Sequence, residues 1–479
     1  MQHHPAHVPS SPLLVVAGTH SGCGKTSVTL GLLRALTRRG LVVQPFKAGP
    51  DFIDPALHAL AAGRPSWNLD SWMCPPHALF HTQSMASEHA PAPDLRLLEG
   101  VMGLHDGASP RSARGSTAEL ARLLDGRVLL VADVHAMARS AAALVQGYVQ
   151  FEPGLDVAGV VLNRVGSARH RSLLAEVFAA HSPGLPVAGM LGRNTAIELP
   201  SRHLGLHLDA EADAFAVTLD RLADWVEEGL DLDALLARLA CPARHQLPAS
   251  PASLPASIPA PSVRLAVARD AAFCFVYAEN LRRLERAGAE LAFFSPLQEA
   301  RLPEGIHGLY LPGGYPELHA PALAANTAMR TAVQAFARSG RPVYAECGGF
   351  MYLLERLETT AGSFPMAGVF PGMARMGERF AALGYREVTT TAATPLGPAG
   401  TRCRGHEFHY SFLVDSQPLD AAAGQVYHVT DRSGTPVPPA PSGACGGWQR
   451  GNVLGSYIHI HFGSNPRLAP ALVAACARA

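Results

Sequence analysis

The chain has 479 residues, of which 48% are hydrophobic and 16% are charged, with 39 basic and 39 acidic side chains. A chain of this length is expected to form about two or three domains, and so high an apolar content excludes a mostly disordered protein. The zero formal net charge argues against nucleic acid or an anionic membrane as a partner, since both favour a basic surplus.

The eight cysteines are scattered, without a CxxC pair or the spacing of a zinc finger. This pattern predicts free thiols in a reducing, cytoplasmic setting. The first ten residues lack the apolar core of a signal peptide, and no apolar run approaches the roughly 20 residues that a membrane span needs. We therefore expect no membrane segment.

Short apolar runs in the first half of the chain predict strands at residues 13–17, 41–46, 95–98, 128–132, 157–162 and 187–191. These runs do not alternate between apolar and polar residues, which is typical of strands buried on both faces of a parallel sheet. Helical patterns lie between them, for example at 27–39 and 117–124. The order of elements predicts a doubly wound α/β domain.

A stretch rich in Pro, Ala and Ser, with almost no charge, then interrupts the pattern. It is expected to form an extended linker. A second α/β pattern begins with a predicted strand at Val263. We therefore expect a disordered tail at 1–11, a first domain at 12–240, the linker at 241–262 and a second domain at 263–479.

The strand at 13–17 runs directly into a glycine-rich loop and a helix. In such a loop backbone N–H groups point at an anion, Lys25 can bridge the terminal phosphates of ATP, and the Thr26 hydroxyl can bind Mg²⁺. Five residues rather than four separate Gly18 from Gly24, a spacing that resembles the loop of dethiobiotin synthetase. The predicted ATP-binding loop comprises Gly18, Thr19, His20, Ser21, Gly22, Cys23, Gly24, Lys25 and Thr26.

Acidic residues follow two further predicted strands. Glu99 and Asp106 lie in EGVMGLHDG, and Lys47, Asp51 and Asp54 lie in FKAGPDFIDP. Ligands bind at the carboxyl edge of an open α/β sheet, and Mg²⁺ prefers oxygen ligands. We expect Glu99 and one of Asp51 or Asp54 to bind Mg²⁺. The alternative is that both aspartates are turn formers beside prolines.

Two further loops contain candidate binding residues. Asn163 ends another strand and could read the adenine edge of ATP, with a loop-capping role as the alternative. Arg202 and His203 could bind an anionic substrate, or they could belong to an ordinary polar loop.

The segment RPVYAECGGFMYLL predicts a strand, a sharp turn at Cys347 and a helix that starts near Gly349. This is the layout of a nucleophile elbow. The adjacent helix N-terminus is expected to lower the pKa of the thiol, and nearby backbone N–H groups can hold an oxyanion. We expect these donors to come from Gly348 and from Gly313 or Gly314 in a facing loop, LPGGYPE.

The candidate base for Cys347 lies on a late predicted strand, VLGSYIHIHF, which presents His459 and His461 on one face. His459 aligns with the Tyr-x-His pattern of class I glutamine amidotransferase domains. Many such domains have an acid two residues later, where this chain has His461, so a Cys347–His459 pair without an evident acidic third member is expected. Cys445 also precedes Gly-Gly, but it lacks a flanking strand and helix and is expected to be a loop residue.

In chain order, GTHSGCGKT, FKAGPDFIDP, EGVMGLHDG, LPGGYPEL, AECGGFMYL, GHEFHYS and SYIHIHF resemble the cobyrinic (or hydrogenobyrinic) acid a,c-diamide synthase family, over about residues 13–466. The resemblance implies an N-terminal P-loop NTPase-like, dethiobiotin synthetase-like domain with a parallel sheet and a C-terminal class I glutamine amidotransferase-like α/β domain. It also implies a ligase that uses ATP, Mg²⁺ and L-glutamine to amidate the a and c acetate groups of a corrin ring through acyl phosphates.

The resemblance further implies that Cys347 is the nucleophile, assisted by His459. Asp51, Asp54 and Asp106 would lie where the corrin carboxylate meets the γ-phosphate. Lys47, Arg202 and His203 are further candidates for contacting the substrate or activating its carboxylate. Three residues of GHEFHYS would shape a domain interface or an ammonia route, or serve packing: His406, Glu407 and Tyr410.

Three alternatives remain open from the sequence. Cobyric acid synthase shares both domain types but amidates other side chains, and a nickel-sirohydrochlorin a,c-diamide synthase would act on a different ring. A P-loop partitioning or switch ATPase fused to an inert amidotransferase-like domain would not amidate at all. Neither cobalt in the ring nor the oligomeric state can be read from the sequence, although the resemblance is compatible with a homodimer.

Overall fold

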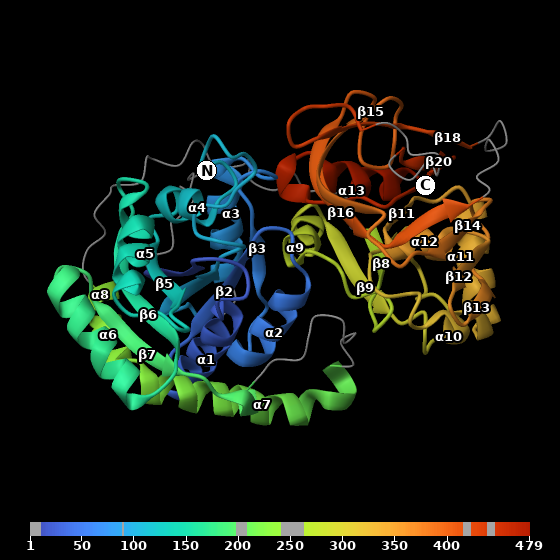
Figure 1. Ribbon diagram of the computed structural model, residues 1–479. Helices are drawn as coiled ribbons and strands as arrows, with labels where there is room; N and C mark the ends of the chain where they lie inside the picture. The colour runs from blue at the N-terminus through green and yellow to red at the C-terminus, as the bar shows by residue number, and fades with distance from the viewer. Residues whose placement is uncertain (1–10, 89–90, 198–207, 241–262, 415–422, 438–445) are drawn as a thin grey trace. The chain divides into compact units, whose positions relative to one another are not determined.

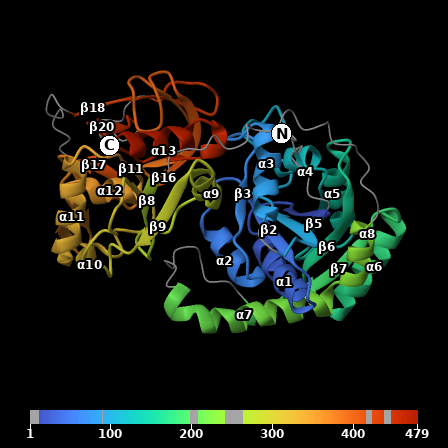
Figure 2. The same ribbon diagram turned by 180° about the vertical axis from the view of Figure 1, so that it is seen from behind.

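The computed structural model describes residues 11–88, 91–197, 208–240, 263–414, 423–437 and 446–479. The chain divides into two compact units, Met1–Leu254 and Pro255–Ala479, and both are seen in Figures 1 and 2. The predicted linker lies outside the described residues, as do Arg202, His203 and Cys445. Among the described residues, no helix is long and apolar enough to cross a membrane.

Seven parallel strands form one sheet in the first unit, in the order β3-β2-β4-β1-β5-β6-β7. The six predicted strands are confirmed, whereas β3 was missed because it is only three residues long. The strands are β1 (Leu13–Gly18), β2 (Val43–Ala48), β3 (Trp67–Leu69), β4 (Leu95–Glu99), β5 (Arg127–Asp133), β6 (Val157–Val165) and β7 (Val187–Gly192).

Helices cover both faces of this sheet, with α1, α2 and α7 on one side and α3, α4 and α5 on the other (Figure 1). The doubly wound α/β class predicted for the first unit is therefore confirmed. The helices are α1 (Lys25–Arg38), α2 (Ile53–Ala62), α3 (Pro76–Ser87), α4 (Thr117–Leu123), α5 (Arg139–Gln150), α6 (Ala168–His181), the 3₁₀ turn η1 (Thr195–Ile197), α7 (Leu208–Gly229) and α8 (Leu232–Leu239).

The second unit also has an α/β fold, built on a sheet of order β18-β20-β21-β11-β10-β8-β9. The five strands from β21 to β9 are parallel, and β20 and β18 are antiparallel additions at one edge. The strands are β8 (Val263–Ala268), β9 (Ala289–Phe294), β10 (Gly308–Leu311), β11 (Val343–Glu346), β18 (Ala423–Gln425), β20 (Trp448–Arg450) and β21 (Val453–Ser456).

The described residues of the second unit also form two smaller sheets, each of four strands, and six helical segments. The first sheet contains β12 (Arg356–Thr359), β13 (Gly362–Pro365), β14 (Met373–Met376) and β17 (Ser411–Val414). The second contains β15 (Ala382–Thr390), β16 (Arg402–His409), β19 (Tyr427–Asp431) and β22 (His459–Ile460). The helical segments are α9 (Ala278–Arg286), α10 (Ala320–Ala325), α11 (Thr327–Arg338), α12 (Gly348–Leu353), η2 (Phe462–Ser464) and α13 (Leu468–Arg478).

Charged residues interrupt the apolar strands near their carboxyl ends. Lys47 is next to last in β2, Glu99 ends β4 and Glu346 ends β11, and all three are buried. A charge in such a place is costly unless it is paired and hydrogen-bonded. These strand ends are therefore where the fold places groups that serve chemistry rather than packing.

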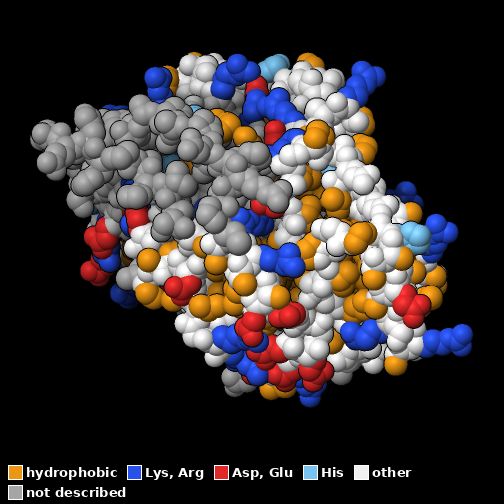
Figure 3. Space-filling view, turned by 90° about the vertical axis from the view of Figure 1, so that its left-hand side faces the viewer, with side chains coloured by type: hydrophobic (Ala, Val, Ile, Leu, Met, Phe, Trp, Pro, Cys, Tyr) orange, Lys and Arg blue, Asp and Glu red, His pale blue; other side chains and the backbone are white. Residues whose placement is uncertain are grey.

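The surface in Figure 3 agrees with the balanced composition of the chain. On the described part of that face, acidic and basic side chains lie close together and do not form separate fields of one sign. Ion pairs such as Arg34–Asp220 and Arg38–Asp224, each with a shortest N–O distance of 2.7 Å, join α1 to α7 on the surface.

Gly31 allows α1 to pack closely against α7. A Cβ atom at Gly31 would lie 2.6 Å from the Leu222 carbonyl oxygen and 2.5 Å from Val226 Cγ2, whereas a Cβ at the helical Gly147 would meet nothing within 4 Å. We expect Gly31→Ala to lower the free energy of unfolding by about 1–3 kcal/mol, since the helices must separate. Gly147→Ala should be neutral or stabilising by up to about 1 kcal/mol. Equal shifts of the denaturation midpoint in the two variants would contradict this account.

Candidate active sites

The glycine-rich loop of the first unit wraps tightly around the start of α1. Gly22 and Gly24 have positive φ angles of 83° and 101°, which residues with a Cβ rarely adopt. Gly24 is the N-cap of α1 and provides no side-chain cap, so the first N–H groups of the helix can receive an anion. Lys25 folds back over the loop and donates to the carbonyls of His20 (3.1 Å) and Met102 (2.6 Å).

Asn163 braces this loop from β6. Its Nδ2 donates to the Cys23 carbonyl at 2.8 Å, and its Oδ1 accepts from the Arg164 backbone N–H at 2.8 Å. A Cβ at Gly24 would lie 2.2 Å from Asn163 Nδ2, so the glycine is needed for this approach. Asn163 therefore caps the loop, and it also lines the cavity beside the loop, so adenine reading stays a prediction.

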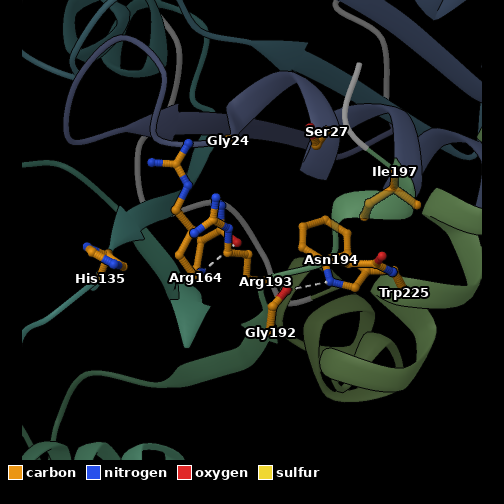
Figure 4. Close-up of a pocket in the computed structure, with 10 residues that line it drawn as sticks. Gly24, Ser27, His135, Arg164, Gly192, Arg193, Asn194, Ile197 and Trp225 are labelled. Atoms are coloured by element: carbon orange, nitrogen blue, oxygen red, sulfur yellow. Dashed lines mark hydrogen bonds between the residues drawn. The ribbon is translucent and has the colours of Figure 1, made fainter. Parts of the chain in front are cut away.

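A cavity of about 410 Å³ opens beside the loop. Gly24 and Ser27 line it on the loop side, and Arg164, Arg193 and Trp225 line it elsewhere (Figure 4). The Trp225 indole N–H donates to the Gly192 carbonyl at 3.0 Å, which fixes the ring at the cavity wall. The volume and position suit a nucleoside attached to phosphates in the loop.

A buried charge cluster lies at the carboxyl edge of the same sheet. Lys47 Nζ lies 2.6 Å from Asp54 Oδ2 and 2.9 Å from Glu99 Oε1, and His58 Nε2 lies 2.6 Å from Glu99 Oε2. The Thr26 hydroxyl of the phosphate loop donates to Glu99 Oε1 at 2.7 Å. The cluster therefore joins β2, β4, α2 and the start of α1.

The charges in this cluster depend on one another. Burial lowers the pKa of Lys47, but Glu99 and Asp54 outweigh burial and raise it above its ordinary value. Burial raises the pKa of Glu99, but Lys47 and His58 hold it below the ordinary value. Burial, followed by the Glu99 charge, raises the pKa of Asp54 to about 6. Sequence reasoning missed His58, because nothing in ALHAL distinguishes a ligand-like histidine from a core histidine.

The oxygen atoms at this edge fit Mg²⁺ shared with a nucleotide. Thr26 Oγ1 and Glu99 Oε1 are hard donors 2.7 Å apart. Asp51 Oδ1 caps the first turn of α2 by accepting from the N–H groups of Ile53 (2.8 Å) and Asp54 (3.1 Å), so the predicted turn role of Asp51 is present. Among the described side chains, no group of three or more His, Cys, Asp or Glu could hold a metal by itself. Phosphate oxygens would have to complete the coordination.

Asp106 stabilises the loop that follows β4. Its Oδ2 accepts from the Gly103 N–H at 2.8 Å. Leu104, which follows Gly103, donates its N–H to the Gly18 carbonyl at 2.8 Å. A Cβ at Gly103 would lie 3.0 Å from the Thr19 carbonyl oxygen. The structure therefore brings the EGVMGLHDG loop, with Asp106, against the phosphate loop.

The turn at Cys347 in the second unit is strained, as an elbow requires. Cys347 has a φ angle of 46°, and its backbone N–H donates to the Ser456 carbonyl at 2.7 Å. A Cβ at Gly348 would lie 3.0 Å from the Gly314 nitrogen, and one at Gly349 would lie 2.1 Å from the Leu311 carbonyl oxygen. The two glycines after Cys347 are therefore required by the facing strand and loop, β10 and LPGGYPE.

The predicted base and the predicted oxyanion donors lie around the same loop. A Cβ at Gly313 would lie 2.3 Å from His459 Cε1, so the imidazole packs directly on this loop. The next residue of the loop, Gly314, lies against Gly348. His459 is 2% exposed. Burial, followed by His406 and His409, lowers the pKa of His459 well below its ordinary value. A neutral imidazole is the form that can accept a thiol proton.

The predicted lowering of the thiol pKa is wrong for the free protein. Burial is the largest influence and, with the charge of Glu317, raises the pKa of Cys347 above its ordinary value, against the opposing effect of the Gly348 N–H. The helix α12 has only six residues, and its dipole does not compensate for desolvation. The effect of Glu317 was missed because only the glycines of its loop, LPGGYPE, were considered as functional residues.

The late strand also differs from the prediction, because it is broken after Ser456. β21 ends there, β22 contains only His459 and Ile460, and His461 is the N-cap of η2. His461 Nε2 lies 3.3 Å from Glu279 Oε2, and its ring lies 4.6 Å from the ring of Tyr277. His461 thus pairs with Glu279, and Tyr277 connects this pair to His406 through a hydrogen bond of 2.8 Å between its hydroxyl and His406 Nδ1.

The GHEFHYS segment contains the last part of β16 and the first residue of β17, and it lines the histidine site. His406 pairs with His459 across β16 and β22, and their rings stack with centroids 4.8 Å apart. Glu407 is fully buried and pairs with Arg386 (2.9 Å) and His409 (2.8 Å). Tyr410 instead packs on Phe380, with ring centroids 4.3 Å apart.

The two sites define an enzyme that joins a nucleotide-binding domain to a glutamine amidotransferase domain. Residues 14–206 match the CobQ/CobB/MinD/ParA nucleotide binding domain, and residues 264–467 match the CobB/CobQ-like glutamine amidotransferase domain. The chain is 47% identical to the cobyrinate a,c-diamide synthase of Syntrophotalea carbinolica, over 98% of this chain and 99% of that protein. It is 40% identical to the hydrogenobyrinate a,c-diamide synthase of Streptomyces coelicolor, over 97% of each chain. The chain belongs to the a,c-diamide synthase family, as its motifs indicated.

Removal of the Lys47 ammonium should leave two buried carboxylates without their cation. We expect Lys47→Met to lower the free energy of unfolding by about 3–5 kcal/mol, since an uncompensated buried charge is costly. Arg38→Ala removes solvent-exposed ion pairs with Asp224 and Glu227 and should cost at most about 1 kcal/mol. Denaturant unfolding of both variants measures the difference. A Lys47→Met variant as stable as Arg38→Ala would contradict the role of the cluster.

The pH dependence of Cys347 alkylation tests the electrostatics of the elbow. Because its pKa lies above the ordinary value of 9.0, the thiolate is scarce at neutral pH and its fraction rises as pH rises through and beyond that value. We expect the rate of alkylation by iodoacetamide, followed by peptide mass spectrometry with Cys347→Ala as the blank, to increase with pH beyond about 9. A plateau near neutral pH would show that the thiol is already ionised in the free enzyme.

Proposed function

We propose that this protein amidates the a and c acetate carboxylates of a corrin ring, using ATP and glutamine. The observation that carries the proposal is the presence, on one chain, of a phosphate loop beside a buried acid–lysine cluster and of a cysteine on a strained turn whose facing glycine loop also packs against a neutral histidine. Relatives named cobyrinate and hydrogenobyrinate a,c-diamide synthase support the substrate class. Because both names occur, the ring could be metal-free or carry cobalt.

The first unit would activate the carboxylate. Loop residues from Gly18 to Thr26 would hold the phosphates of ATP, with Lys25 at the terminal ones. Mg²⁺, held by Thr26, Glu99 and Asp51, would supply charge neutralisation at the phosphate oxygens. A corrin carboxylate oxygen would attack the γ-phosphorus, forming the acyl phosphate and releasing ADP.

Charged residues at the sheet edge would orient that carboxylate. Lys47 and Asp54, as an ion pair, would fix the net charge at this edge of the sheet. Asp106 would hold its loop against the phosphate loop. Arg202 and His203 are proposed to contact the acidic side groups of the ring. A dry edge suits this step, since water would hydrolyse the acyl phosphate.

The second unit would supply ammonia. The Cys347 sulfur would attack the glutamine amide carbon while His459 takes the thiol proton and passes it to the departing ammonia. N–H groups of Gly348 and of Gly313 or Gly314 would hold the oxyanion. Water would then release glutamate from the thioester, and ammonia would displace phosphate from the acyl phosphate to give the amide. The described cysteines are free thiols, which suits the proposed cytoplasmic location.

Variants at the two sites should separate the half-reactions. We expect Cys347→Ala to lose glutamine-dependent amide formation and to keep the rate with added ammonium, because only the ammonia source is removed. Lys25→Ala should lose amide formation with either nitrogen source. Cys274→Ala, which alters another thiol of the second unit, is the control and should keep both rates. Glutamine-dependent amidation by Cys347→Ala, or ammonium-dependent amidation by Lys25→Ala, would refute the assignment of the two sites.

A further inference from the structure

The base of the glutaminase site has a buried carboxylate beside it, although the expected acid position holds a histidine. Glu346 directly precedes Cys347 and ends β11, and its side chain is 1% exposed. Its Oε2 lies 4.0 Å from His459 Nδ1. Glu279, another buried acid, lies 3.3 Å from His461 instead.

The Glu346 carboxylate is held in place from three strands. Oε1 accepts from the Tyr344 hydroxyl at 2.5 Å, and also from the Ile460 backbone N–H, the residue after His459, at 2.9 Å. Oε2 accepts from the Tyr310 hydroxyl at 2.9 Å. The carboxylate therefore links β11, β10 and β22, and a shift of Glu346 would move the strand that carries the histidine.

Proton transfer from Cys347 would create a buried imidazolium at His459. His406, stacked at 4.8 Å, and His409 both disfavour that charge. Glu407 favours it, but both Glu407 oxygens already pair with Arg386 and His409. Among the described residues, the hydrogen-bond donors to Glu346 are neutral: two tyrosine hydroxyls and one backbone N–H. Its Oε2 lies 4.0 Å from His459 Nδ1, so Nε2 is the nitrogen proposed to accept the thiol proton. A buried ion is stabilised strongly by an opposite charge at this distance.

We propose that Glu346 is the positioning residue of His459, orienting its ring and offsetting its charge, in place of the acid missing two residues downstream. This inference rests on the proposed glutaminase function of Cys347. Glu346 undergoes no net proton transfer: the thiol proton passes to His459 and then to ammonia. The carboxylate acts only through the imidazole.

A pH dependence follows from the surroundings of Glu346. Burial raises its pKa to about 7, against the hydrogen bonds from Tyr344, Ile460 and Tyr310. Below that pH the carboxyl gains a proton and no longer offsets the imidazolium, so the glutaminase kcat of the wild type should fall as pH decreases through about 7. Burial also raises the pKa of Glu317, whose charge acts on Cys347, to about 7, so the low-pH limb of the profile belongs to Glu346 only if it disappears when Glu346 is replaced. The titratable groups around the site besides Glu346 are Glu317, Cys347, Cys403, His406, Glu407, His409, His459, Tyr310, Tyr344 and Tyr427. They are unchanged in a Glu346→Gln variant.

The test compares Glu346→Gln with Glu279→Gln, which alters a buried carboxylate beside the other histidine. We expect Glu346→Gln to lower the glutamine-dependent kcat by about 100-fold or more with little change in KM for glutamine, and to lose the low-pH limb of the profile. Its ammonium-dependent amidation should stay within about twofold of wild type, because that reaction bypasses His459. Glu279→Gln should keep the glutamine-dependent kcat within about threefold.

A glutamine-dependent kcat of Glu346→Gln within about threefold of wild type, or an equal loss in Glu279→Gln, would overturn the proposal. If Glu346→Gln does not fold, Tyr310→Phe replaces it, since it removes only the hydroxyl on the oxygen facing His459. That variant should lose about 3- to 10-fold in glutamine-dependent kcat with its ammonium rate unchanged, and an unchanged kcat would overturn the proposal. Absence of glutaminase activity in the wild type is a separate result, which would refute the proposed function itself.

Discussion

A lysine ammonium held between two buried carboxylates is the interaction on which the first unit depends. Lys47 comes from β2, Glu99 from β4 and Asp54 from α2, and none of them has bulk water to solvate its charge. Each charge is stable only while the others are present. Through Thr26 the same cluster reaches the phosphate loop, so the geometry of the nucleotide site and the packing of the sheet edge are set together.

In the second unit the site is positioned by a strained backbone turn, whereas in the first unit it is positioned by paired buried charges. Cys347 is held at a positive φ angle by the Ser456 carbonyl behind it and by the loop that faces Gly348 and Gly349. Strain of this kind persists only where the surroundings impose it. In both units the reactive group comes at the carboxyl end of parallel strands, where side chains and loop backbone from several strands converge.

Local sequence predicts the parts of this protein that depend on local physics. Uninterrupted apolar runs were enough to predict the buried strands of the first sheet. The spacing of glycines was enough to predict the phosphate loop and the turn at Cys347. Contacts between distant residues were not accessible in this way. His58 contacts Glu99 from 41 positions away, and Glu346 binds the backbone of Ile460 from 114 positions away, and no local pattern indicates either contact.

Two further predictions failed for reasons of packing. A strand period of two placed His459 and His461 on one face of a continuous strand, but the strand ends at Ile460, and His461 turns into a cluster with Glu279. A helix N-terminus after Cys347 was expected to lower the pKa of the thiol, but α12 is short and Cys347 is buried. Burial could not be estimated from the motif alone, and here it outweighs the dipole.

The central claim is that nitrogen released at Cys347 becomes the amide nitrogen of a corrin activated at the phosphate loop. The most direct test is to incubate the enzyme with ATP, either cobyrinate or hydrogenobyrinate, and glutamine that carries heavy nitrogen in its side-chain amide. The corrin product is then analysed by mass spectrometry. The account predicts heavy nitrogen in new amides at both the a and the c positions of the accepted ring. Consumption of ATP and glutamine without heavy nitrogen in the corrin would contradict it.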